Sequence, residues 1–267
     1  MTDRAALGRH LATSGLAGTV ATPVSSCIDN ARRLVAGRPD HTFGLSDWRD
    51  VDVDAVIAAL RACGVTLGEA EDLDATAYVD PAVAAAAVEH HGAVLAEWAR
   101  GGARVLLATG HAFALLPHYA GLARALEAAG CRILEPLGGE RERLKTPEGE
   151  PCSVRYFEGV GSLIVHGSLR HTHRPDYMEA MLDAAGGPAG VDAVIADHGF
   201  AGAAIEAGVP TVSIADVNDP ALPLAQACGR TDGVLVIDDG LPPATYEPLT
   251  AVMIAGFLPR TEGRLSR

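Results

Sequence analysis

The chain has 267 residues, of which 48% are hydrophobic, so we expect one buried core with a helical extension. Its 21 basic and 34 acidic side chains give a net charge of −13, which argues against nucleic acid or an anionic membrane as the main partner. The five cysteines are scattered and form no C-x-x-C pair, which argues against a disulfide framework and a zinc knuckle.

The first 101 residues are predicted to be a helical region that packs on a sheet formed later in the chain. Thr22 followed by Pro23 is typical of an N-cap and the first position of a helix. Further helices are predicted over 53–63 and 81–100, each of which is followed or ended by glycine. The intervening segments 41–48 and 67–77 are predicted to be loops.

From residue 102 onwards, short apolar strands alternate with helices. Strands over 104–108 and 131–134 enclose a helix over 115–129, which matches the size of a parallel β-α-β unit. Two further strands, at 153–156 and 161–166, are predicted to form a hairpin around Gly159.

The alternation returns in the last third of the chain. Strands are predicted over 191–196, 210–215 and 233–237, with helices between them. This pattern predicts an α/β fold with an open, mostly parallel, Rossmann-like sheet in the C-terminal half. We expect the α/β catalytic portion, 102–267, and the helical region, 1–101, to form one compact unit.

Each predicted strand ends in polar residues, and ligands of open α/β sheets bind outside the carboxyl ends of the strands. Turn formation accounts for any single polar segment, because Asp, Asn and Gly are common turn residues. Histidines at four of these positions, out of ten in the chain, favour a functional site instead. The candidates for general acid or base are His111, His171, His173 and His198.

Two groups of residues are candidates for binding phosphate. Thr109 and Gly110 precede a predicted helix, whose N-terminal amides and dipole favour an anion. A tight turn that requires glycine is the alternative explanation for Gly110. Arg170 and Arg174 flank the His-x-His sequence and suit bidentate phosphate binding.

The carboxylates Asp197, Asp216 and Asp219 follow two neighbouring predicted strands and suit Mg²⁺ or another divalent cation. His171 and His173 are alternative metal ligands, or a solvated polar loop. No nucleotide cofactor motif is present, since Gly110 lacks the glycine spacing of a dinucleotide site and the only lysine, Lys145, is not in a Walker sequence.

The N-terminal helix after Pro23 carries residues of two kinds. Cys27 and Arg33 match the C-x5-R pattern of cysteine phosphatases, but a position inside a helix argues against that chemistry. Asn30, Arg32 and Arg33 are expected either to cover the site or to form an exposed basic helix end that complements the helix dipole.

Several segments of the chain resemble those of a bacterial family of phosphatases. They are Thr109-Gly-His111, His171-Thr-His173-Arg-Pro175, Asp197-His-Gly-Phe-Ala-Gly-Ala-Ala204 and Ala215-Asp-Val-Asn-Asp-Pro-Ala221, with Val20-Ala-Thr-Pro23 and Phe43-Gly-Leu45 nearer the N-terminus. The resemblance extends through most of the chain. It implies hydrolysis of phosphate esters.

The sequence therefore predicts a metal-assisted hydrolase that releases phosphate from a small phosphate monoester. An isomerase or transferase for a phosphosugar or nucleotide-linked sugar, and a non-catalytic module that binds a small ligand, remain alternatives with the same residues. The expected partner is a small phosphorylated or polar metabolite, with homo-oligomerisation left open. The start of the chain lacks a signal-peptide pattern, and no apolar run is long enough to span a membrane, so a cytoplasmic location is expected.

Overall fold

The computed structural model describes residues 4–67, 75–138 and 144–257. Within these residues, nine strands form one mixed sheet with the order β12-β11-β10-β4-β8-β7-β6, while β5 pairs with β4 and β9 pairs with β8. The strands are β4 (Arg104–Thr109), β5 (Arg132–Leu134), β6 (Leu144–Lys145), β7 (Pro151–Phe157), β8 (Val160–Val165), β9 (Ser168–Leu169), β10 (Ala193–Asp197), β11 (Thr211–Ala215) and β12 (Gly233–Val236).

The sheet is parallel from β12 to β8, and β4 is also parallel to β5. The pairs β7–β8, β6–β7 and β8–β9 are antiparallel and include the predicted hairpin. Strands β10, β11 and β12 are buried along their whole length, as expected of continuous apolar strands covered on both faces. The predicted α/β fold with a mostly parallel sheet is confirmed.

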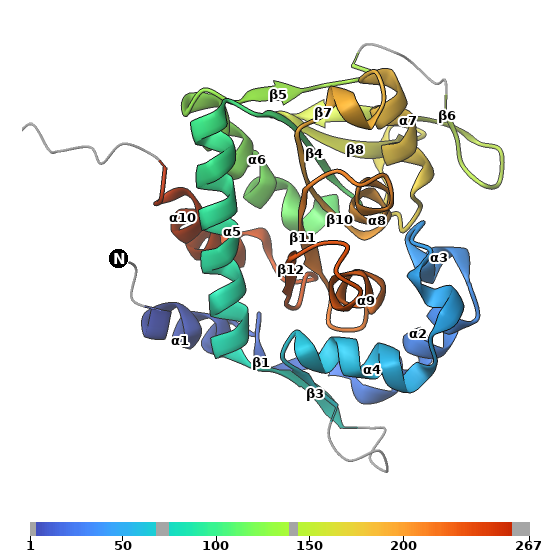
Figure 1. Cartoon of the computed structure of the whole chain (residues 1–267), viewed down its shortest axis with the longest axis vertical. Coiled ribbons are helices and arrows are strands. Elements are labelled where there is room, and N and C mark those ends of the chain that lie inside the picture. Colours follow the sequence, from blue (N-terminus) through green and yellow to red (C-terminus); the bar gives the residue numbers. More distant parts are fainter. Residues whose placement is uncertain (1–3, 68–74, 139–143, 258–267) are drawn as a thin grey trace, which may run out of the picture.

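Helices cover both faces of the sheet (Figure 1). Their bounds are α5 (Pro81–Gly101), α6 (Ala112–Ala128), α7 (Asp176–Ala184), α8 (His198–Glu206), α9 (Ala221–Ala227) and α10 (Glu247–Ile254), with short 3-10 helices η2 (Pro188–Gly190) and η3 (Pro243–Tyr246). Helices α5, α6 and α10 lie on one face, and α7, α8 and α9 lie on the other. Helices α7 and α10 have no counterpart among the helices predicted from sequence.

The chain changes direction across the sheet between β4 and β10. Helix α6 leads from β4 to β5 on one side of β4, whereas α8 leads from β10 to β11 on the other side. The crossover helices therefore diverge, and the carboxyl ends of β4 and β10 meet at the topological switch point, where open α/β sheets bind ligands. Thr109 to His111 and Asp197 to Gly199 lie at this point, and Asp216 to Asp219 follow the neighbouring strand β11.

The N-terminal region contains a three-stranded antiparallel sheet that the sequence analysis did not predict. Its order is β1-β3-β2, formed by β1 (Gly18–Pro23), β3 (Thr76–Val79) and β2 (Val65–Thr66). These strands are two to six residues long, too short for a periodic pattern to be distinguished from a loop or a helix end. The predicted loop over 67–77 ends inside β3, and its central residues, 68–74, lie outside the described residues.

The N-terminal helices are α1 (Arg4–Ser14), α2 (Val24–Val35), α3 (Pro39–Thr42) and α4 (Val53–Ala62), with a 3-10 helix η1 (Asp47–Asp50). The predicted N-cap at Thr22 is wrong, because Thr22 belongs to β1 and Pro23 is the N-cap of α2 without a side-chain cap bond. Helix α3 packs against α8, and α4 packs against α9, so this region lies beside the helices that follow β10 and β11 (Figure 1). Buried side chains of both regions belong to one hydrophobic core.

Among the described residues, no helix is long and apolar enough to cross a membrane.

Two histidines are buried in the helical layer away from the switch point. His91 of α5 donates from Nε2 to the Gly233 carbonyl oxygen at 3.1 Å, and His118 of α6 contacts Thr250 Oγ1 through Nδ1 at 2.7 Å. Burial lowers the pKa of His91 to about 3 and the pKa of His118 to about 4. Both imidazoles are therefore neutral in the folded protein at neutral pH.

We predict that His91 and His118 make the protein less stable in mild acid. Because both pKa values are lower in the folded state, their contribution to stability is complete above about pH 6.5 and is lost as the pH falls towards 4 and 3. At about pH 5 each histidine should lower the free energy of unfolding by roughly 2 kcal/mol relative to neutral pH. The free energy of unfolding, measured with urea, should fall less between about pH 7 and pH 5 in His91→Gln than in the unchanged protein. His166→Gln, at an exposed histidine, is the control and should lose as much stability as the unchanged protein. The prediction would be contradicted if His91→Gln lost as much stability between the two pH values as the unchanged protein.

Candidate active site

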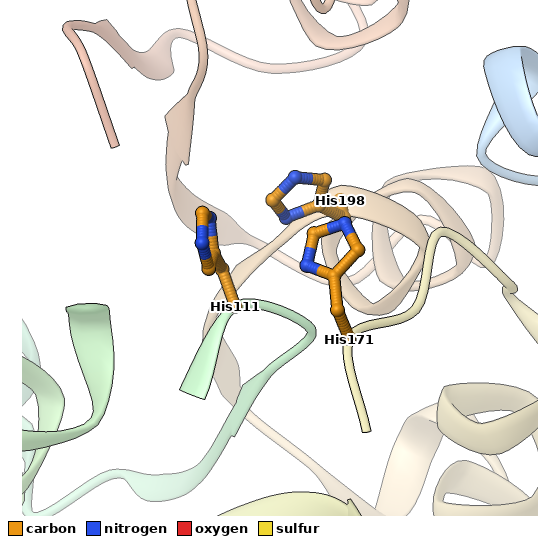
Figure 2. A group of neighbouring side chains, drawn as sticks. All are labelled: His111, His171 and His198. Atoms are coloured by element: carbon orange, nitrogen blue, oxygen red, sulfur yellow. The ribbon is translucent and has the colours of Figure 1, made fainter. Parts of the chain in front are cut away.

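Four histidine rings converge at the carboxyl edge of the parallel strands. His111 follows β4, His171 and His173 lie on the loop after β9, and His198 is the first residue of α8. The ring centre of His171 lies 4.8 Å from that of His111 and 5.0 Å from that of His198, and the His173 and His198 centres are 4.7 Å apart. Figure 2 shows three of these rings meeting from three separate segments of the chain.

Backbone contacts hold the loop 170–174 across the end of β4. Thr172 donates its N–H to the Gly110 carbonyl oxygen at 3.1 Å, and Arg170 donates its N–H to the Leu163 carbonyl oxygen at 2.9 Å. A Cβ atom at Gly110 would overlap with the Thr172 carbonyl oxygen, so only glycine allows this approach. The loop position of His171 and His173 therefore depends on Gly110.

Gly110 does not present a free amide to a ligand. Its N–H donates to Asp197 Oδ1 at 2.7 Å, which uses the donor that the sequence analysis assigned to phosphate. Thr109 is buried, and its Oγ1 accepts from the His111 N–H at 3.0 Å. Thr109 and Gly110, the two predicted phosphate ligands, thus hold the turn after β4 together. Gly110 does not have a positive φ, so the alternative explanation of a tight turn that requires one is wrong as well.

His198 occupies a strained turn between β10 and α8. Its φ is 47°, a conformation that residues other than glycine seldom adopt. The next residue, Gly199, has no room for a side chain, because a Cβ there would overlap with the His173 carbonyl oxygen. The turn directs His198 to the centre of the histidine group, where its Nε2 lies 3.2 Å from Asp219 Oδ2 and 3.6 Å from Asp239 Oδ2.

Asp197 orients His198 through the ring nitrogen Nδ1, on the side away from Asp219. Its Oδ1 accepts from His198 Nδ1 at 2.8 Å as well as from the Gly110 amide. Burial opposes ionisation of Asp197, but hydrogen bonds from His198, Thr109 and Gly110 outweigh it and lower its pKa. Burial opposes protonation of His198, but hydrogen bonds to Asp197 and Asp219 outweigh it and raise its pKa well above the ordinary value. The contact with Asp197 keeps a proton on Nδ1 and directs Nε2 towards Asp219.

The two other carboxylates predicted to bind metal differ in position. Asp219 is buried and reaches the histidine group through its contact with His198 Nε2. Asp216 has no contact with a histidine among the described residues, and burial together with Asp239 and Asp219 raises its pKa to about 8. Asp219 is therefore placed as a candidate ligand, whereas Asp216 lies behind it in the acidic cluster.

Asp239 belongs to the site but was not among the predicted site residues. Its Oδ1 lies 3.1 Å from His111 Nδ1, and its side chain is almost completely buried. The signal was present in the sequence, because Asp238 and Asp239 follow the last strand of the sheet, β12. What the sequence did not reveal is that this strand end faces His111 across the sheet edge.

The donor set fits a divalent metal ion. Two sets of three donor atoms, from His111, His171 and His198 and from His173, His198 and Asp219, each lie within 4.8 Å of one another. The 3.2 Å between His198 Nε2 and Asp219 Oδ2 matches the roughly 3.0–3.4 Å expected between ligands of one ion at about 2.1 Å. His171 Nε2 and His173 Nε2 are 2.7 Å apart, a hydrogen-bond distance that places both nitrogens on the same side of the group.

Two further observations support this fit. Asp239 Oδ2 is buried without a hydrogen-bond partner among the described residues, and it lies 3.6 Å from His198 Nε2. Burial, and then the neighbouring imidazoles, lower the pKa of His171 to about 4, so that this ring is neutral, as a metal ligand must be. A set with more imidazole than carboxylate suits zinc, manganese or iron better than Mg²⁺, which prefers oxygen ligands.

A cavity of about 590 Å³ adjoins the histidine group. We call it the histidine cavity; its lining includes Arg170, His171, His173 and Arg174. Arg174 binds Asp176 through two hydrogen bonds of 2.7 and 3.1 Å, so its guanidinium is already engaged by a carboxylate. Arg170, the other predicted phosphate ligand, makes no side-chain ion pair among the described residues.

The wall of the site is formed by the segment after α3. The Phe43 ring packs edge-on against His173, with ring centres 5.2 Å apart, and also contacts His198. His173 Nδ1 donates to the Asp40 carbonyl oxygen at 2.8 Å, which directs Nε2 towards His171. Gly202 of α8 leaves the space for this segment, because a Cβ there would overlap with the Phe43 carbonyl oxygen.

Helix α2 reaches the site through Asn30, which donates to the Asn218 carbonyl oxygen at 2.9 Å, next to Asp219. Arg33 lies near Asn30, whereas Arg32 pairs with Asp29 on the exposed side of the helix. Cys27 is fully buried, and burial raises the pKa of its thiol to about 12, which is incompatible with a cysteine nucleophile.

Comparison with known proteins identifies the family of the chain. The family model described as Phosphatase matches residues 2–257. A protein of Streptomyces coelicolor (strain ATCC BAA-471 / A3(2) / M145) named Phosphatase SCO2771 is 38% identical over 261 residues, which covers 94% of this chain and 95% of the relative. No solved structure matches the chain. The chain belongs to the Phosphatase family, which confirms the resemblance of its motifs and the prediction of a phosphatase.

Proposed function

We propose that the protein hydrolyses small phosphate monoesters at a divalent metal ion held by the histidine group. The observation that carries this proposal is the convergence of four imidazoles with Asp219 and Asp239 beside a cavity of about 590 Å³. Family membership favours hydrolysis over the isomerase or transferase alternative and over a non-catalytic binding module. The size of the cavity matches sites for small metabolites.

We assign the metal ion to His198 Nε2, His171, His173 and Asp219. His111 and Asp239 lie beside these ligands. A bound divalent ion supplies Lewis acidity for a phosphoryl oxygen and lowers the pKa of water. Asp197 supports the set by holding His198 in one tautomer, a role that carboxylates behind ligating histidines commonly have.

His111 is the best placed candidate for acid-base catalysis. Hydrogen bonding to Asp239 raises its pKa, although burial opposes this effect. A histidine whose protonated form is favoured by a buried carboxylate is suited to donate a proton to a leaving alkoxide. In the ester, water attacks phosphorus in line while the bond from phosphorus to the alcohol oxygen breaks, and that oxygen takes the proton.

The phosphoryl group would lie between the histidine group and Arg170, which lines the same cavity. Arg174 contributes less to phosphate binding than predicted from sequence, because Asp176 occupies its donors. Direct attack by water requires no protein nucleophile, in keeping with the buried Cys27 and with Lys145 lying apart in β6.

We predict that removal of metal abolishes phosphate release. The protein dialysed against a chelator should lose release of inorganic phosphate from a panel of small phosphate monoesters, and Zn²⁺, Mn²⁺ or Fe²⁺ should restore it better than Mg²⁺. The amount of metal bound per chain, measured before and after dialysis, should fall together with the activity. Full activity of protein shown to be metal-free would overturn the proposed metal dependence.

We predict that His171→Asn and His173→Asn leave the protein folded but lower kcat/KM by roughly 10²–10⁴. Both residues lie on a loop, so loss of the ring removes little core packing, while loss of a ligand lowers metal content. His166→Asn, an exposed histidine in the preceding turn, is the matched control and should change neither quantity. Preserved activity and metal content in both loop variants would show that the pair has no part in the reaction.

A further inference from the structure

A second cavity, of about 510 Å³, lies next to the histidine cavity and is lined by Arg33, Arg38, Pro39, Asp40 and His41. We call it the arginine lobe. The two cavities share Pro39, Asp40 and His41, so α3 forms the boundary between them. A ligand that extends past α3 from the histidine group would enter the arginine lobe.

The balance of charge differs between the two cavities. The histidine cavity is lined by Arg170 and Arg174 but also by the carboxylates Asp40, Glu148 and Glu150. In the arginine lobe, two guanidinium groups face only Asp40. Asp40 is also close to Arg174, whose pKa is raised by its hydrogen bond to Asp176 and further by Asp40. The arginine lobe is therefore the more positive of the two, although the chain as a whole carries a charge of −13.

The two arginines of the lobe are not engaged by carboxylates. Arg33 makes one long hydrogen bond, of 3.4 Å, to the neutral side chain of Asn30. Arg38 has no side-chain partner among the described residues. The neighbouring Arg32, in contrast, pairs with Asp29 at 3.1 Å. An arginine without a carboxylate partner keeps its planar set of donors free for a carboxylate or phosphate of a ligand.

Arg33 is also tied to the active site. Asn30 links it to Asn218, the residue before Asp219, through hydrogen bonds of 2.9 and 3.3 Å. His41 lines both cavities, and burial together with the nearby charge of Arg33 lowers its pKa. The lobe and the histidine group thus lie on two sides of one imidazole.

We propose that the arginine lobe binds a second anionic group of the substrate, so that the preferred esters carry a carboxylate or another phosphate in addition to the scissile phosphate. This inference rests on the proposed function, which places the scissile phosphate at the histidine group. Arg33 and Arg38 determine specificity and take no part in bond breaking.

The test compares pairs of esters that have the same length. One member is an ω-carboxyalkyl phosphate, such as 2-carboxyethyl phosphate, and the other is the hydroxyalkyl phosphate of equal length, such as 3-hydroxypropyl phosphate. A series of increasing chain length is used. The measured quantity is the ratio of kcat/KM for the two members of each pair, which cancels general losses of activity.

The unchanged protein should prefer the carboxylate member of at least one pair by about tenfold or more, as expected of charge-assisted hydrogen bonds to arginine. In the double variant Arg33→Gln, Arg38→Gln this ratio should fall close to one. Arg32→Gln, one residue away on the same helix, should keep both the ratio and the rates. A ratio near one in the unchanged protein at every length, or a ratio that survives in the double variant, would overturn the proposal.

Binding separates this inference from the proposed function. If neither ester releases phosphate, the hydrolysis proposal fails, and calorimetric binding of the corresponding phosphonates still decides the role of the lobe. Tighter binding of 3-carboxypropylphosphonate than of 4-hydroxybutylphosphonate, lost in the double variant, would support the second anion site without hydrolysis. Equal affinity for the two phosphonates would refute it.

Discussion

The site depends on the contact between Asp197 and His198 at the end of β10. Asp197 is buried and holds two donors on one oxygen, the His198 ring at 2.8 Å and the Gly110 amide at 2.7 Å. One carboxylate therefore joins the ends of the parallel strands β4 and β10, from which the crossover helices lead in opposite directions. The strained φ of 47° at His198 is maintained because this contact and the packing of Gly199 on the loop 170–174 determine the turn.

Charge is the reason why we expect a cation at this edge of the sheet. The carboxylates of Asp197, Asp216, Asp219 and Asp239 lie together there, and Asp216 has a pKa of about 8 because burial and the neighbouring Asp239 and Asp219 oppose its ionisation. Buried carboxylates at such density are stabilised by hydrogen bonds, by protonation or by a metal ion. The imidazoles differ in how they respond to this set: Asp197 and Asp219 raise the pKa of His198 against the effect of burial, whereas burial and the neighbouring imidazoles lower the pKa of His171 to about 4.

The sequence predicted the fold from β4 onwards because its strands are apolar runs separated by helices of ordinary length. It also predicted the edge of the sheet that carries the site, since polar residues follow the strands at Thr109, Asp197 and Asp216. The small sheet of β1, β2 and β3 was missed, because its strands are too short to show a period. Residue roles were harder to predict. Gly110 and Thr109 were assigned to phosphate, although both are used to hold the turn, and Asp239 was omitted because its nearness to His111 depends on tertiary packing alone.

The central claim is that the histidine group binds a divalent metal ion. Crystals of the protein purified without added metal, measured on both sides of the absorption edges of zinc, iron and manganese, test it most directly. The account predicts an anomalous peak at about 2.0–2.2 Å from His198 Nε2 and from Asp219, with His171 or His173 completing the coordination. A protein that is active in the same preparation but shows no anomalous density among these residues, or a metal ion held by Asp197 and Asp216 instead, would contradict it.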